Sequence, residues 1–245
     1  YLSTLEAKSH LKKFRPLSIL VDSSVLAHAI THETAWISTG VKKWGPHDIE
    51  TGYAARIPIH AEDCTSRSYY EIRFLPGIAY LVRSGYLNFF KSAELSAEQW
   101  RQPIGRYSGY YSDDLNLFAG LSIESIDGHE LDLADAKAKQ LQRINSCSDP
   151  LFQDLVRLLG QKSSFDAYHI YTAEKHGLYC FLHFDFKLAN KIKDVRANPI
   201  IQNLHTKVFL PSELGEDLGI RPMSPRLLSY EGASFPVRPD LHMPG

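Results

Sequence analysis

The sequence contains little cysteine and no long apolar run. Its three cysteines, Cys64, Cys147 and Cys180, are odd in number, lie far apart and form no CxxC pair. This pattern excludes a disulfide framework and a structural zinc site of the usual spacing, and it favours a reducing, cytoplasmic setting. No apolar run approaches the roughly 20 residues that span a bilayer, and no secretory signal is recognisable near the N-terminus. We therefore expect no membrane partner.

The chain also has almost no net charge. Lysine and arginine number 27 against 28 aspartates and glutamates, which gives a formal net charge of -1. A protein that coats duplex nucleic acid normally has a large basic field, so any nucleic-acid contact here must come from local patches. With 245 residues, 44% of them hydrophobic, the chain is long enough to bury a substantial core.

Short apolar strands alternate with helical segments in the later part of the chain. We expect strands at 17–22 (LSILVD), 86–90 (YLNFF), 178–184 (LYCFLHF) and 207–211 (KVFLP). We expect helices at 25–33, 67–75, 95–100, 132–145, 150–159, 164–176, 186–195 and 211–219. This alternation predicts an α/β fold, namely a three-layer α/β/α sandwich with a mainly parallel central sheet.

Two long stretches interrupt this pattern. Residues 36–66 and 101–130 show no sustained hydrophobic period, and we expect irregular loops there. We therefore predict a single domain over 1–220 with insertions near 30–66 and 101–160. A C-terminal tail, 221–245, contains five prolines and is expected to wrap the surface.

Three aspartates stand at comparable places in the expected elements. Asp22 and Asp185 each follow an apolar strand, and Asp166 begins the helix that precedes the strand leading to Asp185. A single aspartate in such a place is ordinarily a turn former or a helix cap. Together, the three could converge, because the carboxyl ends of strands in an open α/β sheet face one crevice. Converging carboxylates suit Mg²⁺ or Mn²⁺, which can activate water against a phosphodiester.

The segments around these aspartates resemble the PIN-domain nuclease family. SILVDSSVL (18–26) resembles the first motif, a hydrophobic strand followed by Asp and small hydroxyl residues. The stretch 163–192, SSFDAYHIYTAEKHGLYCFLHFDFKLANKI, resembles the distal block with its two aspartates. TKVFLPSELGEDLG (206–219) resembles the closing strand and helix. The chain is longer than a compact PIN toxin, and its insertions have no recognised counterpart.

The resemblance implies a ribonuclease that cleaves RNA with Mg²⁺ or Mn²⁺. It implies that Asp22, Asp166 and Asp185 coordinate the metal together with a fourth acid, usually a glutamate on a helix between the two blocks. Glu71 is the predicted fourth ligand, because helix 67–75 is the best helix there and a short strand follows it. Weaker candidates in expected loops are Glu62, Asp63, Asp113 and Asp114.

Other residues near these motifs have predicted supporting roles. Ser24 is expected to orient the metal ligands by hydrogen bonding. His183 replaces the Ser or Thr of many family members, and it is predicted either to contact a phosphate or to cap a strand end. Lys187, Lys191 and Arg106, the last in a tyrosine-rich segment, are predicted substrate contacts, with a solvated basic face as the alternative.

The resemblance also suggests partners. The expected substrate is single-stranded RNA. Many family toxins are blocked by an inhibitor protein and dimerise, so an antitoxin-like inhibitor and a homodimer are expected by analogy with toxin–antitoxin systems.

Two alternative functions fit parts of the same sequence, and two further motifs are incomplete. A non-enzymatic PIN-like module would bind RNA or protein without cleaving, and a metal-dependent phosphatase would hydrolyse a phosphate monoester. His28 and His32 have the spacing of a zinc-binding HExxH motif, but Ala29 replaces its glutamate. The segment after Asp22 also lacks the second aspartate of haloacid-dehalogenase-like phosphatases, because Ser24 stands there.

Overall fold

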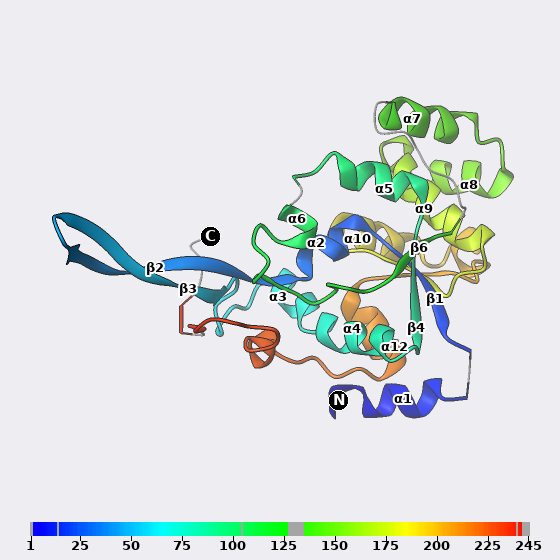
Figure 1. Cartoon of the computed structure of the whole chain (residues 1–245). Helices are drawn as coiled ribbons and strands as arrows, with labels where there is room; N and C mark the ends of the chain where they lie inside the picture. The colour runs from blue at the N-terminus through cyan, green and yellow to red at the C-terminus, as the bar shows by residue number, and fades with distance from the viewer. Residues whose placement is uncertain (1, 14, 104, 127–134, 239, 242–245) are drawn as a thin grey trace.

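A five-stranded parallel sheet forms the centre of the molecule, in a computed structural model that describes residues 2–13, 15–103, 105–126, 135–238 and 240–241. The strand order is β6-β4-β1-β7-β8. These strands are β6 (Ile123–Ser125), β4 (Leu87–Lys91), β1 (Leu17–Val21), β7 (Cys180–Leu182) and β8 (Lys207–Phe209). Every neighbouring pair is parallel, and helices flank the sheet (Figure 1). The predicted three-layer α/β/α fold is therefore confirmed.

Strand β1 lies in the middle of the sheet, and its side chains alternate between two cores. Ile19 and Val21 face one apolar cluster, whereas Leu20 faces another, and all three are buried. Successive side chains of a strand point to opposite faces, so an unbroken apolar run is what a strand covered on both faces requires. This explains why the apolar runs identified the strands from the sequence.

The two clusters correspond to the two helical layers seen on either side of the sheet in Figure 1. The first layer contains α1 (Leu5–Leu11), α3 (Arg67–Ile72), α4 (Leu75–Arg83) and α12 (Pro211–Leu218). The second contains α5 (Ala93–Trp100), α7 (Ala136–Ser146), α8 (Pro150–Leu159), α9 (Ser164–Lys175) and α10 (Phe186–Val195). Shorter elements are η1 (Leu2–Thr4), α6 (Gly105–Ser108), η2 (Gln161–Ser163), α11 (Pro199–Gln202) and η3 (Pro225–Leu228).

A long antiparallel hairpin replaces the loop and part of the helix expected after Asp22. Helix α2 (Ser23–His28) ends early, and β2 (Ile30–Trp44) then pairs with β3 (His47–Pro58). The predicted helix 25–33 is therefore wrong from residue 30 onward, where β2 begins. The predicted loop 36–66 is wrong up to residue 58, where β3 ends. We call residues 30–58 the arm, because the hairpin projects far from the body of the molecule (Figure 1).

The second predicted insertion, 101–160, contains short strands and several helices. A two-residue strand, β5 (Leu115–Asn116), extends the arm sheet, and β6 adds the outer strand of the central sheet. The expected helix 132–145 corresponds to α7, although residues 127–134 lie outside the described residues. Asp149 caps α8 by accepting a hydrogen bond from Leu151 N at 2.9 Å, with Pro150 at the first helical position as predicted.

The base of the arm is held by the tail. The buried Arg56 side chain of β3 donates from Nε to Asp113 O at 2.7 Å and from Nη1 to Ser229 O at 3.0 Å and to Glu231 O. Val237 adds an isolated parallel bridge to Arg56. Across the described part of the chain, no helix has the length and apolarity that crossing a membrane would require.

We expect Leu20→Ala to destabilise the protein by about 2–5 kcal/mol, because Leu20 is 0% exposed and its truncation leaves a cavity beneath α9. Urea denaturation followed by circular dichroism measures the change in the free energy of unfolding. Leu2→Ala, at a residue that is 79% exposed, is the matched control and should change it by less than about 0.5 kcal/mol. Equal effects of the two variants would contradict the assignment of β1 to the centre of the sheet.

Candidate functional site

The carboxyl ends of β1, β4 and β7 lie side by side, because β1 pairs with both other strands in parallel. Asp22 follows β1, Ser92 follows β4, and Asp185 follows β7 after a short connection. Strand order reverses at β1, since the chain passes from β1 to β4 and β6 on one side and to β7 and β8 on the other. Such a switch point is where ligands bind in open α/β sheets.

Ser24 connects the ends of β1 and β7. Its backbone N–H donates to Asp22 Oδ2 at 3.3 Å, and its hydroxyl also contacts this carboxylate oxygen. Phe184 N donates to Ser24 Oγ at 3.1 Å. One hydroxyl thus orients the Asp22 carboxylate and fixes the backbone that leads to Asp185, so Ser24 lies where the predicted supporting residue is required.

Asp185 caps α10, whereas His183 lies beneath it. Asp185 Oδ1 accepts hydrogen bonds from Lys187 N at 2.6 Å and Leu188 N at 3.2 Å, and the residue is exposed. His183 is buried, and its Nδ1 accepts the Asp185 N–H at 3.2 Å. Burial lowers the pKa of His183 to about 4 although Asp22 and Asp185 oppose the shift. A neutral, buried imidazole of this kind supports the strand end and is not available to a phosphate.

Asp166 lies in the first turn of α9, close enough to the other two acids to be affected by their charges. Burial raises its pKa, and repulsion from Asp185 and Asp22 adds to the rise, whereas His169 and a hydrogen bond from Ser163 lower it. The three predicted aspartates therefore act on one another electrostatically. Their role as metal ligands stays a prediction.

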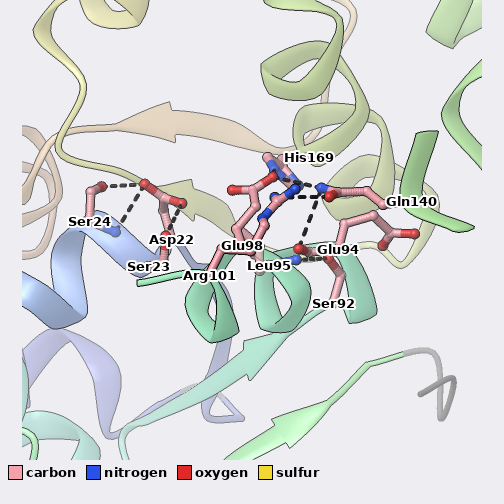
Figure 2. Close-up of polar contacts among 10 residues, drawn as sticks. All are labelled: Asp22, Ser23, Ser24, Ser92, Glu94, Leu95, Glu98, Arg101, Gln140 and His169. Carbon is pink, nitrogen blue, oxygen red and sulfur yellow. Dashed lines mark hydrogen bonds and ion pairs between the residues drawn. The ribbon is translucent and has the colours of Figure 1, made fainter. Parts of the chain in front are cut away.

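Glu98, on α5, adds a fourth acid that was not predicted. Its Oε1 accepts a hydrogen bond from His169 Nε2 at 3.2 Å (Figure 2). The charges of Asp22 and Asp166 also act on His169. Although burial opposes protonation, attraction to Glu98 raises the pKa of His169 to about 9, and the side chain is 4% exposed. His169 is therefore a buried cation among carboxylates, and its charge in turn lowers the pKa of Glu98 against the effect of burial.

Helix α7 holds the Glu98 carboxylate from the other side. Gln140 Nε2 donates to Glu98 Oε1 at 2.8 Å, and Arg101 Nη2 donates to Gln140 Oε1 at 3.0 Å. One turn earlier on α5, the buried Glu94 pairs with Arg143 of α7 at 3.1 Å. Both hydrogen bonds to Glu98 use Oε1, so neither of them engages Oε2. In Figure 2, this network lies beside Asp22 and its two serines.

Glu71, the predicted fourth ligand, has a different environment. Its Oε2 accepts from Ser212 N at 2.7 Å and its Oε1 from Ser212 Oγ at 2.9 Å, and the residue is 3% exposed. Burial raises its pKa, and the charges that act on it are those of Glu213 and Arg67. Glu71 thus satisfies the N-terminus of α12, whereas Glu98 contacts His169, on which the charges of Asp22 and Asp166 also act.

A sequence signal for Glu98 was present in SAELSAEQW (92–100). The segment follows the expected strand 86–90, so its two glutamates lie in the helix that begins just after a strand end. Asp22 and Asp185 were selected because they also follow strand ends. Glu98 is near Asp22 because β4 pairs with β1. This pairing joins two distant segments, so the hydrophobic pattern of either segment alone does not predict it.

The three predicted substrate-binding residues differ in solvent exposure and in their hydrogen-bond partners. Lys187 is exposed next to Asp185, and Arg106 is exposed on α6, where Nη1 donates to Gln102 Oε1 at 3.4 Å. Lys191 instead donates to Leu159 O at 3.2 Å and Ser163 Oγ at 2.6 Å, so it joins α10 to the end of α8. Lys187 and Arg106 therefore remain the better placed of the three to meet a ligand.

A complete metal cage is not formed by these acids. Among the described residues, no group of three or more His, Cys, Asp or Glu side chains is arranged closely enough to hold a metal ion. The donors nevertheless share one chemistry, since Asp22, Glu98, Asp166 and Asp185 offer only carboxylate oxygens, the ligands that hard divalent cations take. The arrangement can concentrate negative charge at one edge of the sheet and can hold a proton on His169.

Comparisons with known proteins assign no family to this arrangement. No protein-family model, no curated protein and no solved structure matches the chain.

Protonation of His169 predicts a pH-dependent stability. Since unfolding returns its pKa to about 6.5, the contribution is fully present below that pH and is lost as pH rises through about 9. We expect the free energy of unfolding to fall by on the order of 3 kcal/mol across this window, and Glu98→Gln to flatten the fall.

Urea denaturation at a series of pH values measures this slope, and nuclear magnetic resonance of the His169 ring measures the pKa directly. Glu216→Gln, which removes an exposed carboxylate on α12, is the matched control and should retain the slope. An unchanged slope in Glu98→Gln would show that Glu98 does not hold the proton.

Proposed function

We propose that the protein is a metal-dependent ribonuclease of PIN type that hydrolyses RNA phosphodiester bonds. The observation that supports this function best is the position of Asp22 and Asp185 after the neighbouring parallel strands β1 and β7 at the switch point of the sheet, with Asp166 close enough for both charges to raise its pKa. Each was expected at this edge from its place after a strand or at a helix start. The segments around them resemble PIN motifs, and this resemblance is the reason for proposing RNA hydrolysis as the reaction.

A Mg²⁺ or Mn²⁺ ion fits this edge by the chemistry of its donors. Asp22, Glu98, Asp166 and Asp185 would hold it, with Ser24 orienting Asp22. Bound there, the ion would polarise the phosphodiester and lower the pKa of an attacking water.

The chain's own residues prepare the site for an anionic substrate. Uncompensated carboxylates would repel a phosphate, and the imidazolium of His169 offsets part of their charge from within the protein. Gln140 and His169 fix one oxygen of Glu98, so the carboxylate needs little reorganisation when a ligand binds. Lys187 and Arg106 stand exposed at the rim, where they are suited to contact phosphates.

We expect Asp22→Asn to reduce cleavage of a labelled RNA by about 100-fold or more, and EDTA to abolish cleavage by the unaltered protein. The neutral amide keeps the volume of Asp22 but removes the charge that a cation requires. The measurement is the initial rate of cleavage with added Mn²⁺, and Glu216→Gln serves as the control. Cleavage that persists in EDTA, or full activity of Asp22→Asn, would refute the mechanism.

A non-enzymatic PIN-like module is the second candidate, and the absence of a closed cage among the described residues favours it. Such a module would bind RNA or protein without cutting. A metal-dependent phosphatase is the third candidate, and it would hydrolyse a phosphate monoester while leaving RNA intact.

Binding of Mn²⁺ separates an intact metal site from a degenerate one. A ligand that binds only the folded state raises the melting temperature by mass action. We expect Mn²⁺ to raise the melting temperature of the unaltered protein and of Glu71→Gln, but not that of Asp22→Asn. A shift that survives in Asp22→Asn and disappears in Glu71→Gln would return the site to Glu71, and no shift in any variant would favour the non-enzymatic module.

A further inference from the structure

The arm is a feature that the candidate site does not explain. A two-stranded hairpin alone is marginally stable in water, and exposed apolar side chains add no stability to it. Yet the arm presents large exposed side chains along its length, namely Trp36, Val41, Trp44 and Ile49. Its stretch from Ala35 to Trp44 extends for about 30 Å at about 3.3 Å per residue.

A β-bulge in β2 determines which side chains lie on each face of the arm. Ser38 pairs with Gly52 and Gly40 pairs with Thr51, so Thr39 is an additional residue on β2. Such an insertion shifts every later side chain of that strand to the opposite face. Beyond the bulge, Trp44 therefore lies on the face opposite Trp36.

The two faces differ in charge. The first, which we call the tip face, contains Ile37, Lys42, Trp44, His47, Ile49, Thr51 and Tyr53. The second, which we call the Trp36 face, contains Trp36, Ser38, Val41, Lys43, Asp48, Glu50 and Gly52. On the Trp36 face, Lys43 lies opposite Asp48 and the Trp36 ring covers Gly52. The tip face has no carboxylate within these residues, and Trp44 is 78% exposed.

We propose that the tip face binds single-stranded RNA and delivers it to the site at Asp22. An exposed indole beside a lysine and a histidine fits a polyanion whose bases are free to stack. Duplexes bury their base faces, so a single strand fits better. The arm also starts directly after α2, the helix that Asp22 caps, so the base of the arm and the candidate site are close in the chain. This inference rests on the proposed function.

A second copy of the chain fits the tip face less well. A two-fold contact through this face would place Lys42 and His47 against the same residues of the other copy. Pairing the tip face of one copy with the Trp36 face of another would match the charges, but such a head-to-tail contact gives a ring or an open filament and not a two-fold dimer. The outer part of the tip face, between residues 37 and 53, thus has no carboxylate and favours an anionic ligand, whereas Glu33 lies on this face at the base of the arm.

Matched double variants on the two faces test the proposal. Trp44→Ala with Lys42→Ala removes an indole and a lysine from the tip face, and Trp36→Ala with Lys43→Ala removes the same types from the other. Both are made in the Asp22→Asn background, and a fluorescently labelled single-stranded RNA of about 20 nucleotides is titrated by anisotropy.

We expect the tip-face variant to raise Kd by about 10-fold or more and to reduce the salt dependence of binding, and the Trp36-face variant to change Kd by less than about 3-fold. Circular dichroism checks that both variants fold. Equal losses on both faces, no loss on either, or tighter binding of duplex RNA would overturn the proposal. A concentration-dependent dimer that only the tip-face variant loses would replace it with a contact between copies.

Cleavage assays separate this proposal from the proposed function. In the presence of Asp22, the tip-face variant should cut a long single strand more slowly but cut a dinucleotide, which is too short to reach the arm, at the unaltered rate. Face-selective binding without cleavage by any variant would refute the nuclease and leave the RNA surface. Cleavage of long RNA at the unaltered rate would refute the arm's role and leave the nuclease.

Discussion

The parallel pairing of β1 with β4 on one side and β7 on the other is the constraint on which the candidate site depends. It places the residues after three strands at one edge, although these strands are far apart in the chain. The Ser24 hydroxyl reinforces this geometry, because it contacts the Asp22 carboxylate and accepts the N–H of Phe184. The helices that begin or pass at this edge then add Glu98 and Asp166 to the aspartates of the strand ends.

Bringing carboxylates together has an electrostatic cost, and the protein offsets it with groups of its own. His169 remains protonated within the fold because Glu98, Asp22 and Asp166 stabilise its charge more than burial disfavours it. His183, only slightly farther along the sheet edge, remains neutral because burial dominates there. Two buried histidines near Asp22 thus have opposite charge states, because among the described residues only His169 contacts a carboxylate, that of Glu98, directly. The resulting edge is acidic but partly balanced before any cation binds.

Helices and strands could be predicted where their own residues, without contacts from distant segments, determine the structure. The apolar runs at β1, β4, β7 and β8 and the Asp149–Pro150 cap required no knowledge of the rest of the chain. The arm escaped prediction because both faces of its outer half are exposed, so no apolar alternation marks it, and the bulge at Thr39 breaks the remaining period. The contacts of Glu71 and Glu98 could not be predicted from the sequence for a related reason. Glu71 is buried by Ser212, a partner from the distant α12, and Glu98 reaches the site only through the pairing of β4 with β1.

The central position of β1 also determines when the molecule can assemble during its synthesis. Ile19 must pair with Cys180, so β1 waits for a partner strand that the ribosome delivers much later in synthesis. The arm, by contrast, pairs residues that follow one another closely and can form soon after it emerges. A nascent chain would therefore display its hairpin well before Asp22 meets Asp166 and Asp185. Whatever chemistry these acids perform is delayed until the segment that contains Asp166 and Asp185 has been made.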